Sequence, residues 1–403
     1  MTGKLLLIGI ASGAIILGAC KSAPSVSEQE ADSRLQNTLA KLRRGETISV
    51  VALGGSITTG YAAQPPGEKG WAGLVNTWLQ ARANESGGKV EYINAGIGGT
   101  DSAYGVMRAK DHVLAHNPDL VIVEFAINDQ WIGGGSRVRK RTFEGLMRQF
   151  LDNSERAVII LSLKARDMEF PDAVSEQKNI AKHYGLNFLD WNSWVKFQEF
   201  SQSFNPNDGI HPNDYGHANI AAGITGFLEA AWNRLPPDDE LLPVAAVLPP
   251  PLTSSEFQNI TYISGKDGME TNLESSGWTA GPSDPPGDWL GKKYEPLIGW
   301  STVSESAELT IRVKGKSVGI LFTESDQFQN CTAWIVDPDG TKTYSKVTAK
   351  CYVSYRNGYF GHAYVEVADN LDVSKEYILH LAVGSNGKAG GKTNVIGVIC
   401  SNP

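Results

Sequence analysis

Four short segments of this chain carry the residue types that enzymes use to transfer acyl groups. They are Gly54-Gly55-Ser56, Gly98-Gly99-Thr100, Asn128-Asp129 and Asp208-Gly209-Ile210-His211. A serine becomes nucleophilic when a histidine takes its proton, and an acidic residue can orient that histidine. Backbone N–H groups of a glycine-rich turn and a side-chain amide can stabilise an oxyanion. The pattern therefore predicts acyl transfer, provided that the four segments meet in the fold.

Each of these residues has an expected role. We predict that Ser56 is the nucleophile, that His211 is its general base and that Asp208 orients the imidazole from three residues earlier. The backbone N–H groups of Ser56 and Gly99 and the side-chain amide of Asn128 would form the oxyanion hole. Each such donor is expected to contribute about 3–4 kcal/mol of transition-state stabilisation.

Each segment also has a plainer interpretation when it is taken alone. Ser56 could cap a helix, Asn128 and Asp129 could cap the following one, and the glycine-rich pieces could be simple turns. His217 is a rival base, although only Asp214 stands three residues before it. We interpret Glu124, an acidic residue in an apolar run, as a structural carboxylate without a catalytic role.

The elements that must position these residues alternate along the first half of the chain. Apolar runs, typical of strands, are separated by amphipathic stretches that indicate helices, which predicts a parallel sheet covered on both faces. Parallel strands present their carboxyl ends at one edge, so the four segments should converge there. The expected strands are 47–54, 90–94, 119–126, 157–163 and 186–190, and the expected helices are 71–82, 103–116, 142–152, 173–184 and 215–232.

In these blocks the chain resembles the SGNH (GDSL-type) hydrolases over about Thr47–Trp232. Two departures occur, at the first block (Gly55-Ser56-Ile57) and at the third (Ala126-Ile127-Asn128-Asp129), and neither replaces a group that does chemistry. The resemblance implies an esterase with a flavodoxin-like parallel sheet. It also implies that Ser56, Asp208 and His211 are the catalytic residues, with no metal or organic cofactor.

The first residues predict export. Lys4 precedes an apolar run, Leu5–Leu17, which ends in Leu17-Gly18-Ala19-Cys20 and resembles a bacterial lipobox with Cys20 as the lipidated residue. The alternative is a membrane-spanning anchor, but the run is shorter than the roughly 20 residues that spanning requires. Lys21 stands where an acidic residue would favour inner-membrane retention, so we expect an outer-membrane or cell-surface location.

The second half of the chain changes character. A proline-rich stretch is followed by short alternating runs with Asp-Gly and Asn-Gly turns, which indicates an all-β, jelly-roll-like sandwich. The expected strands are 307–313, 317–322, 332–336, 363–367 and 377–383. We therefore divide the chain into a signal peptide (1–19), a tether (20–45), the hydrolase (46–234), a linker (235–252) and the sandwich (253–403).

Cysteines, aromatic residues and charge narrow the choice of partners. For Cys331, Cys351 and Cys400 in an exported chain the simplest expectation is one disulfide of unassigned pairing and one free thiol, and no spacing suggests zinc. Trp289 is the best candidate for an exposed sugar-binding ring, although most aromatics of this half should fill the core or an interface. The net charge of −8 and the absence of basic clusters argue against nucleic acid.

The expected function is that of an exported, lipid-anchored serine esterase. We favour acetyl esters of carbohydrates as substrates, because SGNH domains joined to β-sandwiches in exported proteins resemble carbohydrate acetylesterases. The alternatives are a lipase or lysophospholipase, and a carbohydrate-binding surface lipoprotein with a vestigial hydrolase domain. Whether the sandwich binds sugar or only braces the hydrolase stays open.

Overall fold

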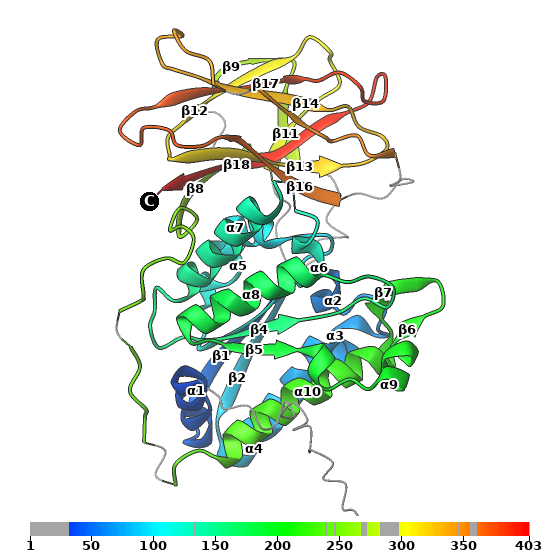
Figure 1. Cartoon of the computed structure of the whole chain (residues 1–403), viewed down its shortest axis with the longest axis vertical. Coiled ribbons are helices and arrows are strands. Elements are labelled where there is room, and N and C mark those ends of the chain that lie inside the picture. Colours follow the sequence, from blue (N-terminus) through cyan, green and yellow to red (C-terminus); the bar gives the residue numbers. More distant parts are fainter. Residues whose placement is uncertain are drawn as a thin grey trace, which may run out of the picture.

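The chain folds into an α/β part and an all-β part that lie against each other (Figure 1). The computed structural model describes residues 32–402 except 133, 238–239, 246, 267–271, 283–297, 345 and 355–360. The predicted signal peptide, Cys20 and Trp289 lie outside the described residues. No helix within the described ranges is both long enough and apolar enough to cross a bilayer.

The α/β part is built on a five-stranded parallel sheet in the order β2-β1-β3-β4-β5, which is the flavodoxin-like order. Nearly every residue of the three central strands is buried, which explains their continuous Val, Ile and Leu runs. The strands are β1 (Thr47–Gly54), β2 (Lys89–Gly96), β3 (Leu120–Glu124), β4 (Ala157–Ser162) and β5 (Asn187–Asp190). The predicted fold class is confirmed.

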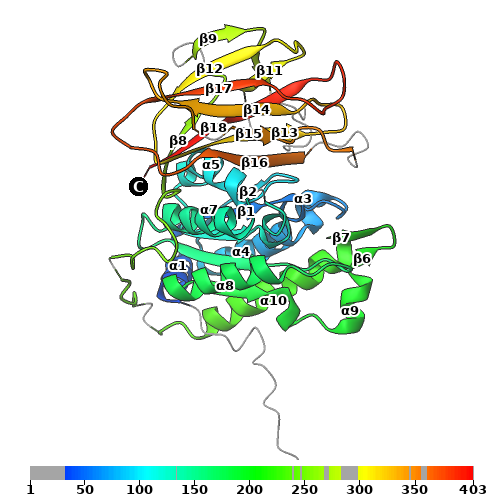
Figure 2. The same ribbon diagram turned by 45° about the horizontal axis from the view of Figure 1, so that its top comes forward.

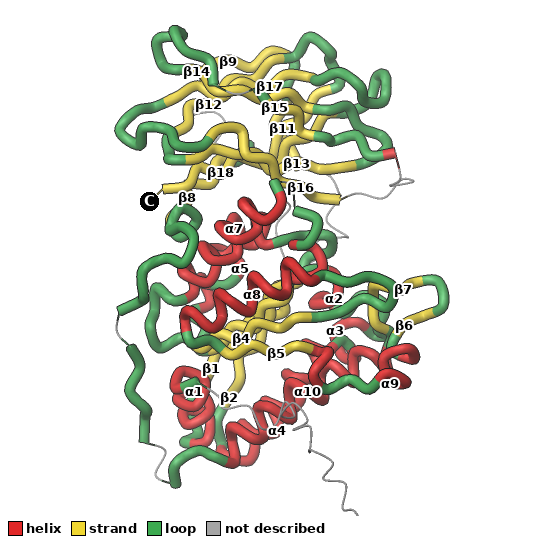
Figure 3. Tube along the Cα trace, in the orientation of Figure 1, coloured by secondary structure: helices red, strands yellow, loops and turns green. Residues whose placement is uncertain are grey.

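Helices cover both faces of this sheet, as Figure 3 shows. One face packs against α1 (Ser33–Arg43), α4 (Trp71–Ser86) and α10 (Asp214–Asn233). The other face packs against α5 (Ser102–His112), α7 (Gly135–Phe150) and α8 (Pro171–Tyr184). The shorter elements are α2 (Ser56–Thr59), α3 (Pro66–Lys69), α6 (Ala126–Asp129), η2 (Leu114–His116), η3 (Trp191–Ser193), α9 (Phe197–Gln202), β6 (Phe204–Asn205) and β7 (Asp208–Pro212).

The segment predicted to be a tether is partly folded. Within residues 20–45, α1 begins after the N-cap Asp32, whose carboxylate accepts a hydrogen bond from the Leu35 backbone N–H at 3.0 Å. Its residues Leu35, Leu39 and Leu42 are fully buried against the sheet. Because these leucines recur at helical spacing and fill the core, the α/β part begins at about Asp32 rather than at residue 46.

The all-β part consists of two antiparallel sheets packed face to face (Figure 2). One sheet has the order β10-β11-β18-β13-β16, with β8 paired to β18, and the other has the order β15-β14-β17-β12-β9. The strands of the first sheet are β8 (Asn259–Ile263), β10 (Thr279–Pro282), β11 (Ile298–Thr302), β13 (Ser317–Glu324), β16 (Gly361–Ala368) and β18 (Thr393–Asn402). Those of the second are β9 (Asn272–Ser276), β12 (Glu308–Val313), β14 (Cys331–Val336), β15 (Val347–Ala349) and β17 (Tyr377–Val383).

The sheet that contains β13, β16 and β18 also packs on the α/β part. Alternate residues of β13 face opposite ways, so that Ile320 joins the sandwich core while Leu321 joins the apolar cluster beneath α5 and α7. Phe257, which precedes β8, enters the same cluster and packs closely on Gly145 of α7, where a Cβ atom would clash. The two parts therefore share one apolar core.

The structure contradicts the expected disulfide. Cys331, Cys351 and Cys400 are all free and buried in the sandwich core. Cys331 lies on β14 and Cys400 on β18, which belong to different sheets. Burial raises the pKa of Cys331 and of Cys400 to about 12, so both thiols remain protonated at neutral pH. In this structure the three cysteines act as small apolar core residues.

Candidate active site

The four segments meet at the carboxyl edge of the parallel sheet, where α2, α6 and β7 lie in Figure 1. Ser56 opens α2 directly after β1, with Gly55 as the extended N-cap residue. A Cβ atom on Gly55 would lie 2.7 Å from Nδ2 of Asn128, so only glycine lets that amide approach the turn that carries Ser56. The α2 helix begins at Ser56 because the chain must turn sharply where the strand ends.

Ser56, His211 and Asp208 form a continuous hydrogen-bonded chain. The Ser56 Oγ lies 2.9 Å from Nε2 of His211, and Nδ1 of His211 lies 2.8 Å from Oδ2 of Asp208. The other oxygen of Asp208, Oδ1, accepts the backbone N–H groups of Ile210 at 2.9 Å and of His211 at 3.0 Å. These bonds hold the acid and the imidazole in one tight turn.

The environment of Asp208 favours its ionised form. Burial raises the pKa of Asp208, but the backbone N–H groups of His211 and Ile210 and the adjacent imidazole outweigh burial and hold it below its ordinary value. An ionised Asp208 accepts the Nδ1–H of His211 and leaves Nε2 as the lone-pair nitrogen that faces Ser56.

The rival base, His217, is occupied elsewhere. Its side chain is fully buried; Nδ1 accepts the backbone N–H of Trp71 and Nε2 donates to the carbonyl oxygen of Tyr61, both at 3.1 Å. Burial lowers its pKa, which keeps the ring neutral. With both ring nitrogens bonded to backbone groups, His217 joins α10 to the loop after α2 and the start of α4 and has no nitrogen left for a base.

The predicted oxyanion donors come from adjacent strand ends. Asn128 lies on α6 after β3, and one N–H of its amide donates to the carbonyl oxygen of Thr100 at 2.8 Å. This bond fixes the amide plane and leaves its second N–H for another acceptor. Gly99 adopts φ +69°, a left-handed conformation that a side chain would strain, and a Cβ there would meet nothing within 4 Å. The backbone at Gly99 is thus open to a ligand.

Buried polar side chains form hydrogen bonds with the turn that carries Ser56 and with the strand ends beside it. Arg108 of α5 is nearly fully buried and donates to the carbonyl oxygens of Ala95 and Gly54. Glu124 accepts from the Thr58 hydroxyl at 3.2 Å and from the Gly55 backbone, and burial raises its pKa to about 7. Glu124 is a buried carboxylate bonded to backbone and hydroxyl groups, as the sequence indicated.

Asp129 bonds to a different helix from the one expected. Its fully buried carboxylate accepts the Ser102 backbone N–H at the start of α5 at 2.8 Å and the Gln177 side-chain amide at 2.9 Å. It therefore supports the first turn of α5, whose N-cap residue is Asp101, and does not cap the helix that follows it in the chain. Burial, together with the nearby Asp101, raises the pKa of Asp129 to about 8.

Two exposed aromatic residues at this edge were not predicted from the sequence. Tyr61, 52% exposed, lies edge-on to the His211 ring with centroids 4.5 Å apart. Trp131, 70% exposed, follows α6, and its backbone N–H donates to the carbonyl oxygen of Asn128 at 3.0 Å. The sequence did not identify either residue as exposed, because the exposure of one aromatic ring depends on which other residues pack around it.

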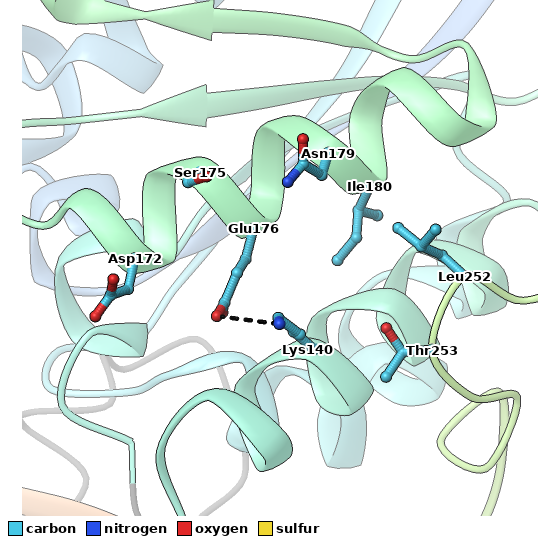
Figure 4. Close-up of a pocket in the computed structure, with 8 residues that line it drawn as sticks. All are labelled: Lys140, Asp172, Ser175, Glu176, Asn179, Ile180, Leu252 and Thr253. Carbon is cyan, nitrogen blue, oxygen red and sulfur yellow. Dashed lines mark ion pairs between the residues drawn. The ribbon is translucent and has the colours of Figure 1, made fainter.

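A separate polar cavity of about 380 Å³ lies between α7 and α8, as Figure 4 shows. Lys140 and Glu176 face each other across it with 3.8 Å between Nζ and Oε1, and Leu252 and Thr253 close one side. None of the four chemical segments lines it. In the described part of the chain no group of three or more His, Cys, Asp or Glu residues is arranged to hold a metal ion.

Residues 52–218 match the model of the GDSL-like Lipase/Acylhydrolase family. The chain is also 30% identical over 111 residues to an arylesterase of Vibrio mimicus, a match that covers 28% of this chain and 52% of that protein. The chain thus aligns with about half the length of this relative.

Among solved structures the fold is similar to that of a two-domain esterase described as active on acetylated mannans. One structure of that esterase, co-crystallised with mannopentaose, has a TM-score of 0.75 and 24% identity and covers 93% of this chain and 96% of the other. A second has a TM-score of 0.76 and 23% identity and covers 93% and 97%. The likeness extends over both parts of the chain and establishes the shared two-part fold. Residues 52–218 are therefore similar to the GDSL-like lipase/acylhydrolase domain, within a two-part fold that the chain shares with this esterase.

Proposed function

We propose that this protein is a serine esterase that removes acetyl groups from carbohydrates. The observation that carries the proposal is the bonded chain from Ser56 through His211 to Asp208 within a GDSL-type domain. The proposed carbohydrate specificity is supported by the two-part fold, which is similar to that of an esterase active on acetylated mannans.

The proposed reaction begins with proton transfer. The Ser56 hydroxyl gives its proton to Nε2 of His211, 2.9 Å away, as Oγ attacks the ester carbonyl. Asp208 stabilises the imidazolium that forms, because it stays ionised and accepts Nδ1–H at 2.8 Å. His211 then protonates the sugar oxygen as its bond to the acetyl carbon breaks, so that the sugar leaves as an alcohol and the acetyl group stays on Ser56. Water, deprotonated by the same imidazole, releases acetate and restores the serine.

The oxyanion of each tetrahedral intermediate would be held by three donors. The backbone N–H of Ser56, the backbone N–H of Gly99 and the free N–H of Asn128 come from the ends of β1, β2 and β3. The Thr100 carbonyl and the glycine at position 55 support this assignment, because both set the plane of the Asn128 amide beside Ser56. Donors fixed before reaction need no reorganisation when charge develops.

Substrate class is tested by comparing esters. We expect the protein to release acetate from acetylated mannan or xylan. Among p-nitrophenyl esters, we expect turnover to fall steeply from the acetyl to the octanoyl ester. Faster turnover of long-chain esters, with no acetate released from acetylated polysaccharide, would favour a lipase instead. Binding of polysaccharide without hydrolysis of any ester would favour a vestigial hydrolase.

We also propose that the protein is exported and anchored through a lipid on Cys20, at the outer membrane or cell surface. The proposal rests on the apolar run that ends in Leu17-Gly18-Ala19-Cys20. A Cys20→Ser protein should leave the membrane fraction, and mass spectrometry of the native protein should find an acylated N-terminal cysteine. A mature terminus elsewhere, or membrane retention of the Cys20→Ser form, would reject the anchor.

A further inference from the structure

The exposed apolar side chains of the α/β part are not scattered over its surface. Among its described residues, all of the large apolar side chains that are exposed follow parallel strands or flank β7, on the active-site edge. They are Tyr61, Trp131, Met168, Phe197 and Tyr215. Single exposed apolar residues are common on proteins, but their confinement to one edge indicates a surface that meets a ligand.

Trp131 is the most distinctive of these residues. It is 70% exposed, whereas the other described tryptophans of the α/β part are fully buried (Trp71, Trp191) or partly buried (Trp78, Trp194, Trp232). Among described residues no hydrogen bond, ring contact or cation contact to its indole is found. A large flat ring thus faces solvent three residues after Asn128, to whose carbonyl oxygen the Trp131 backbone is bonded.

The backbone on both sides of Trp131 is anchored, so the position of the ring is built into the fold. The Gln130 side chain donates to Asp172 at 3.4 Å and accepts the Ala173 backbone N–H at 3.1 Å, which fastens it to the start of α8. Ile132 on the other side is 5% exposed and belongs to the apolar cluster beneath α5 and α7. Ile132 takes the buried position and Gln130 is bonded to the start of α8, which leaves the indole of Trp131 exposed.

The same segment leads to the boundary between the two parts. It continues into α7, where Arg137 is ion-paired with Glu366 and Asp369 at one end of the sandwich. Trp131 thus lies on the chain between the proposed oxyanion donor Asn128 and a helix that is ion-paired with the all-β part.

We propose that Trp131 is a substrate-binding residue whose indole packs against the apolar face of a hexopyranose ring of the acetylated polysaccharide. Aromatic rings supply a large, rigid apolar face, and the C–H face of a pyranose is its natural partner. Because Trp131 follows the proposed oxyanion donor Asn128 by three residues, a sugar held on its indole would lie at the same sheet edge as Ser56. The inference rests on the proposed function and adds a residue that determines affinity for the sugar.

Binding is tested directly in a protein that cannot turn over. Ser56→Ala should bind acetylated manno-oligosaccharide in calorimetry, and Ser56→Ala/Trp131→Ala should bind it roughly tenfold more weakly. Trp131→Tyr, which keeps a flat ring, should restore most of the affinity. Val247→Ala is the control, because Val247 is an exposed apolar residue (81%) of the linker, outside the active-site edge, and should leave binding unchanged.

Kinetics separate this inference from the proposed function. In the active protein, Trp131→Ala should raise KM for acetylated polysaccharide about tenfold and leave kcat/KM for p-nitrophenyl acetate and the melting temperature unchanged. If the parent protein acts on the polymer and Trp131→Ala equals it, the role of Trp131 is wrong while the proposed function stands. If the parent protein releases no acetate from any polysaccharide, both fail. If Trp131→Ala loses activity only on long-chain esters, Trp131 contacts an acyl chain rather than a sugar, and the inference is wrong.

Discussion

Oδ2 of Asp208 lies 2.8 Å from Nδ1 of His211, and its partner oxygen accepts the backbone N–H of the same histidine at 3.0 Å. Acid and base are therefore fixed to each other at both the side chain and the main chain. A spacing of three residues makes this possible, since it brings the carboxylate back over the histidine within one turn.

Asp208→Asn is expected to keep the fold and lower kcat for p-nitrophenyl acetate by about 10³–10⁴-fold. The amide can donate a hydrogen bond where the carboxylate could only accept, so it permits the wrong imidazole tautomer and no longer stabilises the imidazolium. The measurement is kcat alongside the melting temperature. A rate within about tenfold of the parent would show that Asp208 does not orient His211.

Replacing the two histidines should have opposite consequences. His211→Ala should lower kcat by roughly a thousandfold or more and leave the melting temperature unchanged. His217→Ala should lower the melting temperature, because the Trp71 N–H and the Tyr61 carbonyl lose their shared buried partner. The folded fraction of the His217→Ala protein should retain activity. Full activity in His211→Ala, with specific loss in His217→Ala, would reverse the assignment.

Glu124 should make stability depend on pH. Burial raises its pKa to about 7 from an ordinary 4.5. Protons are therefore held more tightly in the folded state, so the stability that the protonated form contributes is full below pH 4.5 and is lost as pH rises through about 7. Glu124→Gln, which imitates that form, should reduce the difference in unfolding free energy between pH 5 and pH 8 by roughly 2–3 kcal/mol.

Denaturant unfolding of both proteins at the two pH values measures this effect. An identical pH dependence in Glu124→Gln would mean that Glu124 is ionised when folded. Its hydrogen bonds to Thr58 and Gly55 would then outweigh its burial.

The boundary between the two parts should be sensitive to Arg141. Its buried guanidinium is paired with Glu256 and, at 2.6 Å, with Glu366. Arg141→Ala leaves both carboxylates buried without that partner, although Lys316 still contacts Glu256, and should lower the unfolding free energy by about 3–5 kcal/mol. Arg312→Ala breaks the exposed pair with Glu376 and should cost about 0–1 kcal/mol. Equal effects of the two variants in denaturant unfolding would contradict a structural role for the boundary.

Much of the fold was predictable because its signals are local. The parallel strands are continuous apolar runs, and the predicted span 47–54 is the observed β1. The strand β18 was missed because residues 393–401 are all buried, with Ile396 and Ile399 facing the hydrolase and Val395 and Val398 facing the sandwich core. A strand covered on both faces shows no alternation, and nothing in the sequence reveals the second cover.

Some residues of the candidate site were predictable from the sequence and others were not. Ser56, Asn128, Asp208 and His211 were predictable because each residue type has a chemical meaning at a strand end. Trp131 was not, because tryptophan is usually buried and only the packing of Gln130 and Ile132 leaves this one exposed. The helix α1 was mistaken for a tether because polar residues interrupt its leucines, although the fold buries three of these polar residues, Arg34, Asn37 and Thr38.

Ser56, activated by His211, is proposed to remove acetyl groups from carbohydrate. The decisive measurement is acetate release from acetylated mannan by the parent protein and by a Ser56→Ala protein with the same melting temperature. We expect sustained release by the parent protein and a rate at least about a thousandfold lower for Ser56→Ala. Equal release by the two proteins, or none by either while p-nitrophenyl acetate is still cleaved, would contradict it.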